Sequence, residues 1–89
     1  MLGSCATYSD RTQEARTAVA VGDYEGGARY INKFLKVRKN EDLPNKYKKD
    51  TALAVLERAT ILHALGLYEL SARDFQEAER ELEFLDLAK

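Results

Sequence analysis

Apolar residues recur at intervals of three and four along most of the 89-residue chain, the spacing of helices that bury one face. Breaks at Gly22, Pro44 and Gly66 separate the periodic segments. The pattern predicts four helices, over about residues 8–21, 24–37, 46–65 and 68–88. Alanine and leucine dominate the apolar composition and proline occurs once, which favours an all-α fold over one with a sheet.

The third predicted helix is apolar around most of its circumference, which is typical of a helix buried on several sides. The fourth is apolar along one stripe only, formed by Tyr68, Ala72, Phe75, Ala78, Leu82 and Leu85. Tyr8, Ala15, Ala18 and Val19 form the inward face of the first helix, and Ala28, Ile31, Phe34 and Leu35 that of the second. We therefore expect the third helix to be central.

One eight-residue segment occurs twice. Residues 22–29 (GDYEGGAR) and 66–73 (GLYELSAR) are identical at five of eight positions, at an offset of 44. Gly22 and Gly66 fit the left-handed position that ends many helices. Tyr24 and Tyr68 would open the next helix, and Gly27 and Ser71 would be small where the two helix axes come closest. Each copy is interpreted as the turn of an antiparallel helical hairpin.

These turns divide the chain into a flexible N-terminus (1–7), hairpin 1 (8–37), a connector (38–45) and hairpin 2 (46–88). Thr7 and Asp10 have the spacing of a capping box for the first helix. Pro44 could start the third helix, where its missing N–H costs nothing, with Asp42 or Asn45 as the cap.

The repeated turn resembles the tetratricopeptide repeat. Gly66, Tyr68, Ser71, Phe75 and Ala78 match that family's pattern in the second copy, and Gly22, Tyr24 and Gly27 match it in the first, with Ile31 and Phe34 as looser fits. The offset of 44 departs from the usual period of 34 residues, and the Trp and closing Pro signals are missing. The resemblance implies two hairpins, four helices in all, stacked as a fragment of a right-handed α-solenoid that binds proteins.

The segment Leu2-Gly3-Ser4-Cys5 resembles the lipobox of bacterial lipoproteins. That resemblance would make Cys5 the lipid attachment site, although no basic start or apolar core precedes it. It implies a periplasmic or outer-membrane location if the chain is trimmed at its N-terminus, and a cytoplasmic one otherwise. The alternative is a frayed end with an idle thiol.

No residue pattern favours catalysis or a bound cofactor. His63 is the sole histidine and lacks a ligand partner at metal-site spacing, so we expect a structural residue that is either at the border of the core or partly buried. The carboxylates of residues 77–86 spread around their helix, which indicates a solvated face. The sequence therefore predicts no catalytic residue, no metal and no cofactor.

Charge is uneven, although the net charge is −1. Lys and Arg minus Asp and Glu give 10 − 7 = +3 for residues 1–50 and 4 − 8 = −4 for residues 51–89. A basic run surrounds the connector: Lys33, Lys36, Arg38, Lys39, Lys46, Lys48 and Lys49. It could meet an acidic partner, anionic lipid or nucleic acid, or be a solvated helix end; the near-zero net charge disfavours nucleic acid.

We therefore hypothesise a non-enzymatic protein–protein interaction or scaffold module that binds a peptide or partner helix. Helix phase suggests a groove lined by Thr12, Arg16, Asn32 and Lys36. Two repeats are few for a stable array, which implies further repeats or self-association. The alternative is a lipid-anchored assembly or structural protein of a bacterial envelope, and an enzyme is a third hypothesis.

Overall fold

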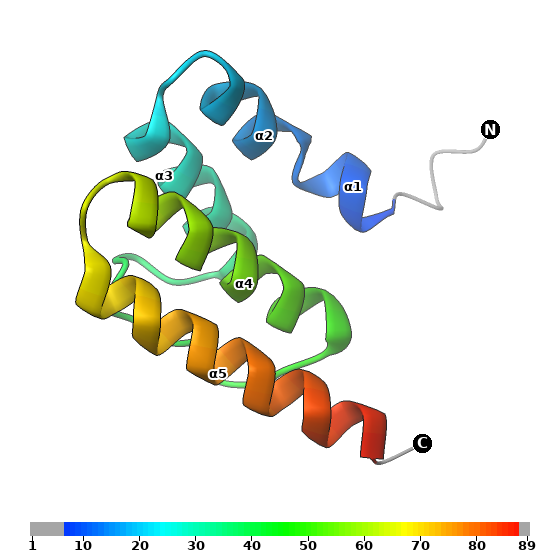
Figure 1. The fold of residues 1–89 in the computed structure, drawn as a ribbon. Helices are drawn as coiled ribbons and strands as arrows, with labels where there is room; N and C mark the ends of the chain where they lie inside the picture. Colours follow the sequence, from blue (N-terminus) through cyan, green and yellow to red (C-terminus); the bar gives the residue numbers. More distant parts are fainter. Residues whose placement is uncertain (1–6, 88–89) are drawn as a thin grey trace, which may run out of the picture.

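The computed structural model describes residues 7–87, which form five helices and no strand (Figure 1). The helices are α1 (Tyr8–Arg11), α2 (Gln13–Ala20), α3 (Tyr24–Leu35), α4 (Lys49–Ala64) and α5 (Tyr68–Leu87). Consecutive helices pack against each other, and α4 lies between α3 and α5. The all-α prediction is confirmed. Cys5 lies outside the described residues.

Both predicted turns are present and have the same backbone geometry. Gly22 and Gly66 have φ angles of 84° and 82°, the left-handed conformation in which a Cβ is unfavourable. After each glycine, the next N–H reaches five residues back: Asp23 to the carbonyl of Ala18 at 2.8 Å, and Leu67 to that of Leu62 at 2.9 Å. This pairing is the Schellman motif, which satisfies the last carbonyls of a helix. The repeated sequence thus encodes a repeated turn.

The small residues after each turn allow close helix contact, as predicted. A Cβ built on Gly27 would lie 2.7 Å from Val19 Cγ2 and 3.4 Å from the carbonyl oxygen of Ala15, both on α2. In the second hairpin the Ser71 hydroxyl donates a 2.7 Å hydrogen bond to the Ala59 carbonyl. Larger side chains at these positions would push each helix pair apart.

The prediction of one continuous first helix was wrong. The Thr7–Asp10 capping box is present, but the helix breaks at Thr12, whose ψ of 15° departs from helical geometry. The Thr12 hydroxyl donates to the Tyr8 carbonyl at 2.8 Å, which holds the break. The Tyr8 ring packs edge-on against Phe34 of α3. The break therefore separates a short helix that holds Tyr8 from the helix that pairs with α3.

The connector is longer than predicted, since α3 ends at Leu35 and α4 begins at Lys49. Pro44 does not start α4, and Asp42 and Asn45 do not cap it. Lys48 is the N-cap residue, and its backbone N–H donates to the Thr51 hydroxyl at 3.3 Å. The Asp42 carboxylate instead accepts the N–H groups of Arg38 and Lys39, so it stabilises a turn inside the connector.

The predicted inward stripe of α5 was correct at Ala78, which is fully buried, and wrong at its N-terminal end. Tyr68 is 61% exposed and Phe75 is 36% exposed, whereas Ser71 and Asp74, which lie outside the predicted stripe, are buried. A polar residue therefore occupies the centre of the face that packs on α4. The reason is an ion pair that periodicity of apolar residues does not reveal.

Arg58 of α4 and Asp74 of α5 form a fully buried ion pair, with both side chains 0% exposed. The guanidinium donates to both carboxylate oxygens, from Nε at 2.7 Å and from Nη2 at 3.1 Å. It also donates to Asn32 Oδ1 of α3 at 2.8 Å and to the Asp42 carbonyl of the connector at 2.9 Å. One side chain thus joins three helices and the connector.

Arg73 extends this network along the connector. Its guanidinium donates to the main-chain carbonyls of Glu41 at 2.7 Å and Asn40 at 3.0 Å, and to the Asp74 carboxylate at 3.0 Å. The Asn32 amide completes the network by donating to the Asn40 side chain at 2.8 Å. The two arginines therefore hold the connector on α4 and α5, and Asn32 holds it on α3.

We expect Arg58→Met and Asp74→Leu each to lower the free energy of unfolding by about 3–5 kcal/mol, because each leaves a buried charge without its partner. The double variant should lose less than the sum of the two, since it leaves neither charge unpaired. Urea unfolding followed by circular dichroism measures the three differences. Strictly additive losses would contradict the pairing.

Candidate functional site

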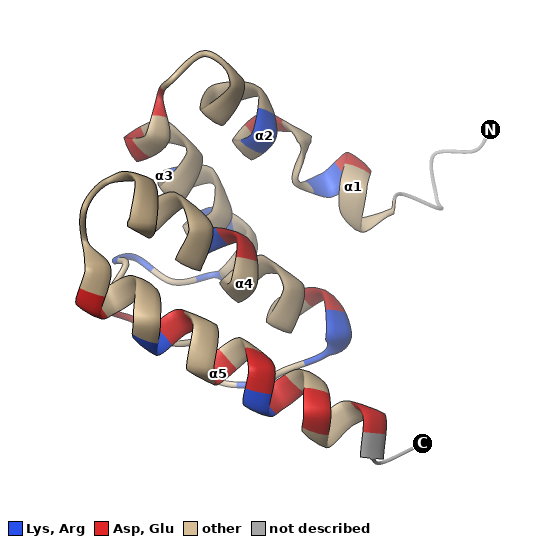
Figure 2. Ribbon diagram, in the orientation of Figure 1, with Lys and Arg blue, Asp and Glu red and all other residues tan. Residues whose placement is uncertain are grey.

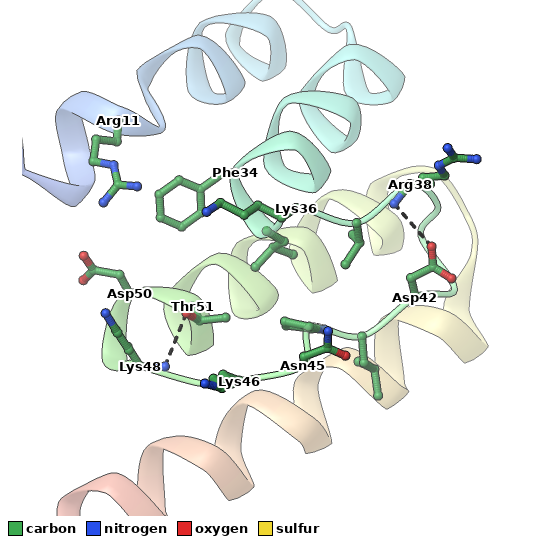
Figure 3. Close-up of a pocket in the computed structure, with 14 residues that line it drawn as sticks. Arg11, Phe34, Lys36, Arg38, Asp42, Asn45, Lys46, Lys48, Asp50 and Thr51 are labelled. Atoms are coloured by element: carbon green, nitrogen blue, oxygen red, sulfur yellow. Dashed lines mark hydrogen bonds between the residues drawn. The ribbon is translucent and has the colours of Figure 1, made fainter.

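A hollow lies where the end of α3, the connector and the start of α4 meet (Figure 3). We call it the connector pocket; its volume is about 830 Å³. It is lined by Arg11, Phe34, Leu35, Lys36, Val37, Arg38, Asp42, Leu43, Pro44, Asn45, Lys46, Lys48, Asp50 and Thr51. Since no residue of α5 lines it, the pocket belongs to the side of the connector near α1 and α3.

The apolar part of the pocket centres on Phe34. The Tyr8 ring meets it edge-on, with centroids 5.6 Å apart and an interplanar angle of 84°. The Arg11 guanidinium lies 4.8 Å from the ring centroid, within range of a cation–π interaction. Leu43 and Pro44 supply apolar surface from the connector. The pocket can therefore accept an apolar side chain.

The charged part of the pocket is predominantly positive. Five of the lining residues are cationic and two, Asp42 and Asp50, are anionic. Asp42 already accepts two main-chain N–H groups. Among residues 7–87, the side chains of Lys36, Arg38, Lys46 and Lys48 form no ion pair. Their charges are therefore available to an anionic ligand.

Lys36 occupies a conformation that normally selects glycine. Its φ is 61°, and among the described residues it alone has a positive φ without being glycine. The Val37 N–H donates to the Asn32 carbonyl at 3.0 Å, so α3 ends with the same bonding as the two glycine turns. A lysine at this position costs about 1 kcal/mol relative to glycine. Such an outlier is a reason to consider a role for its ammonium group.

Tyr8 fixes the α1 side of the pocket. Its hydroxyl donates to the Glu57 carboxylate of α4, and its ring contacts Phe34. Burial, followed by the adjacent Glu57 carboxylate, raises the pKa of Tyr8 well above its ordinary value, while Arg16 opposes part of the shift. The protonated phenol is thus the form that the fold stabilises.

The structure brings two of the four predicted groove residues together, since Arg16 Nη1 donates to the Thr12 hydroxyl at 2.7 Å, but it does not gather all four at one surface. Lys36 lines the connector pocket, and Arg16 is half-exposed near Glu57, 3.9 Å away. Thr12 and Asn32 are buried, with hydroxyl and amide groups engaged by internal partners. Asn32 and Thr12 therefore hold the fold, and the site that the structure presents lies at the connector.

The other candidate groups do not assemble a reactive site. His63 is exposed and its ring lies edge-on to that of Tyr68, with centroids 5.0 Å apart, so of the two predicted positions partial burial was wrong. Within residues 7–87, no cluster of three or more His, Cys, Asp or Glu side chains could hold a metal ion. None of the helices in that range is both long and apolar enough to cross a membrane.

Sequence reasoning missed Arg58, Asp74 and Arg73 as the residues that position the connector. A signal was available for Arg58: with Glu57 it interrupts the apolar residues of the third predicted helix. A buried charge needs a partner, and Asp74 is the acidic residue within the small-residue face of α5. Neither residue follows from helical periodicity.

Comparison with known proteins gives no relative: no family model, curated protein or solved structure matches the chain.

We expect Lys36→Gly to raise the free energy of unfolding by about 1 kcal/mol, because glycine adopts the left-handed conformation without strain. Urea unfolding measures the change. Lys33→Gly, inside the last turn of α3, is the matched control and should lose about 1 kcal/mol. A Lys36→Gly protein less stable than wild type would contradict the strain assigned to this position.

We expect the stability contribution of Tyr8 to disappear at high pH. The unfolded chain loses the phenolic proton near pH 10, whereas the folded chain retains it to higher pH, so stability is complete below about pH 10 and falls above it. Above about pH 10, the difference in free energy of unfolding between wild type and Tyr8→Phe should narrow by at most about 1.4 kcal/mol per pH unit. Urea midpoints of both proteins from pH 7 to 11 test this. Lysines also titrate in this range, but they are the same in both proteins, so their effect cancels in the difference. A constant difference would contradict this expectation.

Proposed function

We propose that this chain is a non-enzymatic protein–protein interaction module whose connector pocket binds an acidic segment of a partner protein. The observation that carries the proposal is the combination of an apolar centre at Phe34 with a rim of unpaired cations. Carboxylates of a partner would face the lysines, and an apolar side chain between them would contact Phe34, Leu43 and Pro44. Apolar contact contributes affinity, and the charges contribute selectivity.

A second, smaller hollow of about 440 Å³ does not have this character. Its lining includes Glu25 and Glu41 as well as Arg29, Arg38 and Lys39, so charges of both signs meet in it. It also lacks an aromatic side chain. The connector pocket is therefore the better candidate for an anionic peptide.

The fold suits a binding scaffold. We propose that the two hairpins are a tetratricopeptide-like fragment of a right-handed α-solenoid, because their turns share sequence, φ angle and hydrogen bonding. Each helix from α2 to α5 packs on its neighbour along the chain, as in stacked repeats. The alternative of a lipid-anchored envelope protein depends on Cys5, outside the described residues, and is compatible with the same pocket.

We expect a short fluorescein-labelled peptide of glutamates with two leucines to bind the full chain, as measured by fluorescence anisotropy. The Lys36→Glu/Lys46→Glu variant should bind about 30-fold more weakly. Two attractive pairs, each worth about 0.5 kcal/mol, become repulsive, a change of about 2 kcal/mol. Affinity should also fall as ionic strength rises from about 0.05 M to about 0.5 M, because the charges are exposed.

The matched control is Lys33→Glu/Lys49→Glu, which changes net charge equally at exposed residues outside the pocket. It should retain most of the affinity, and a peptide with glutamine in place of glutamate should bind weakly. Equal losses in the two double variants would refute a specific pocket. So would binding to vesicles of anionic lipid with none to the peptide.

A further inference from the structure

The outward face of α5 carries carboxylates that nothing in the described chain neutralises. Glu69, Glu79 and Glu83 are exposed and form no ion pair or hydrogen bond among residues 7–87. Helical spacing places them on one side of α5, away from the buried face of Ser71 and Ala78. Other acidic residues of this helix are partly neutralised; Glu77, for example, pairs with Arg80 at 2.7 Å.

Apolar side chains border these carboxylates. Phe75, 36% exposed, lies one helical turn before Glu79, and Tyr68, 61% exposed, lies one turn before Ala72, which is also exposed. The outward face of α5 thus presents carboxylates and aromatic rings together on one helix. Those are the two kinds of group that the connector pocket is suited to accept.

The connector pocket and the outward face of α5 carry opposite charge within one molecule. Residues 1–50 carry a net +3 and residues 51–89 a net −4. Figure 2 shows acidic residues gathered along α5, with basic residues at the connector and at the start of α4. A molecule with opposite charges on different faces attracts a second copy of itself in a defined orientation.

The two surfaces cannot meet within one chain. The connector pocket is lined by residues of α1, α3, α4 and the connector, and by none of α5. The buried face of α5 is fixed against α4 by the Arg58–Asp74 pair, so Glu79 and Glu83 point away from the molecule. Contact between these surfaces therefore requires two copies.

We propose that the acidic segment bound by the connector pocket is α5 of a second copy of this chain. Glu79 and Glu83 would face Lys36 and Lys46, and Phe75 would contact the apolar part of the pocket. The inference rests on the proposed function and names its partner. Because the contact joins two different surfaces, each copy has one surface left for a further copy, and head-to-tail repetition gives open chains or rings.

Sedimentation velocity of the full chain at low salt tests the proposal. Wild type should show a mean mass that rises with concentration above the 10.1 kDa monomer and falls back as salt is added. Lys36→Glu/Lys46→Glu and Glu79→Lys/Glu83→Lys should each remain monomeric, because like charges then face each other. Lys33→Glu/Lys49→Glu should associate as wild type does.

Mixing the two charge-reversed variants is the decisive measurement. The acidic pocket of one variant then meets the basic α5 of the other, and the basic pocket of the second meets the acidic α5 of the first. Association should return in the mixture although neither variant associates alone, and the variant carrying all four substitutions should associate by itself. A mixture that stays monomeric overturns the proposal.

Failure here is distinguishable from failure of the pocket. If wild type remains a monomer at about 1 mM but binds the acidic peptide, the pocket stands and self-recognition is refuted. Glu79→Lys/Glu83→Lys should still bind that peptide, since its pocket is intact. Wild-type association that neither charge reversal alters would also refute the proposal, because another surface would then mediate it.

Discussion

The buried Arg58–Asp74 pair is the interaction on which the rest of the fold depends. Removing two charges from water is costly, and the molecule offsets that cost with hydrogen bonds from Arg58 to both carboxylate oxygens of Asp74 and to the Asp42 carbonyl. An alternative rotation of α5 would leave Arg58 without an anion. The pair therefore fixes which face of α5 meets α4, a role that is separate from its net contribution to stability.

The same network determines where the connector lies. In a chain of four substantial helices, a long linker without regular structure would otherwise have few preferred positions. Arg58 and Arg73 bind its carbonyls, Asn32 binds Asn40, and Asp42 closes its first turn. The connector pocket is thus formed by a loop held from beneath by the helical core.

Features encoded by neighbouring residues could be predicted from the sequence. The glycine turns, the Thr7 cap and the close contacts at Gly27 and Ser71 each depend on local chemistry, and the structure contains all of them. The rotation of α5 and the connector length could not be predicted, because both depend on Arg58 meeting residues distant in sequence. For the site, the basic run was evident, but its assembly around Phe34 required the fold.

Main-chain recognition of the connector has an evolutionary consequence. The two arginines contact backbone atoms of Asn40, Glu41 and Asp42, which every amino acid provides. Nearby positions such as Leu43, Asn45 and Lys46 line the pocket, and their carbonyls are not among those that the arginines bind. Substitutions there can accumulate while the helical core persists, so the shape and charge of the pocket can change through those few positions without loss of the fold.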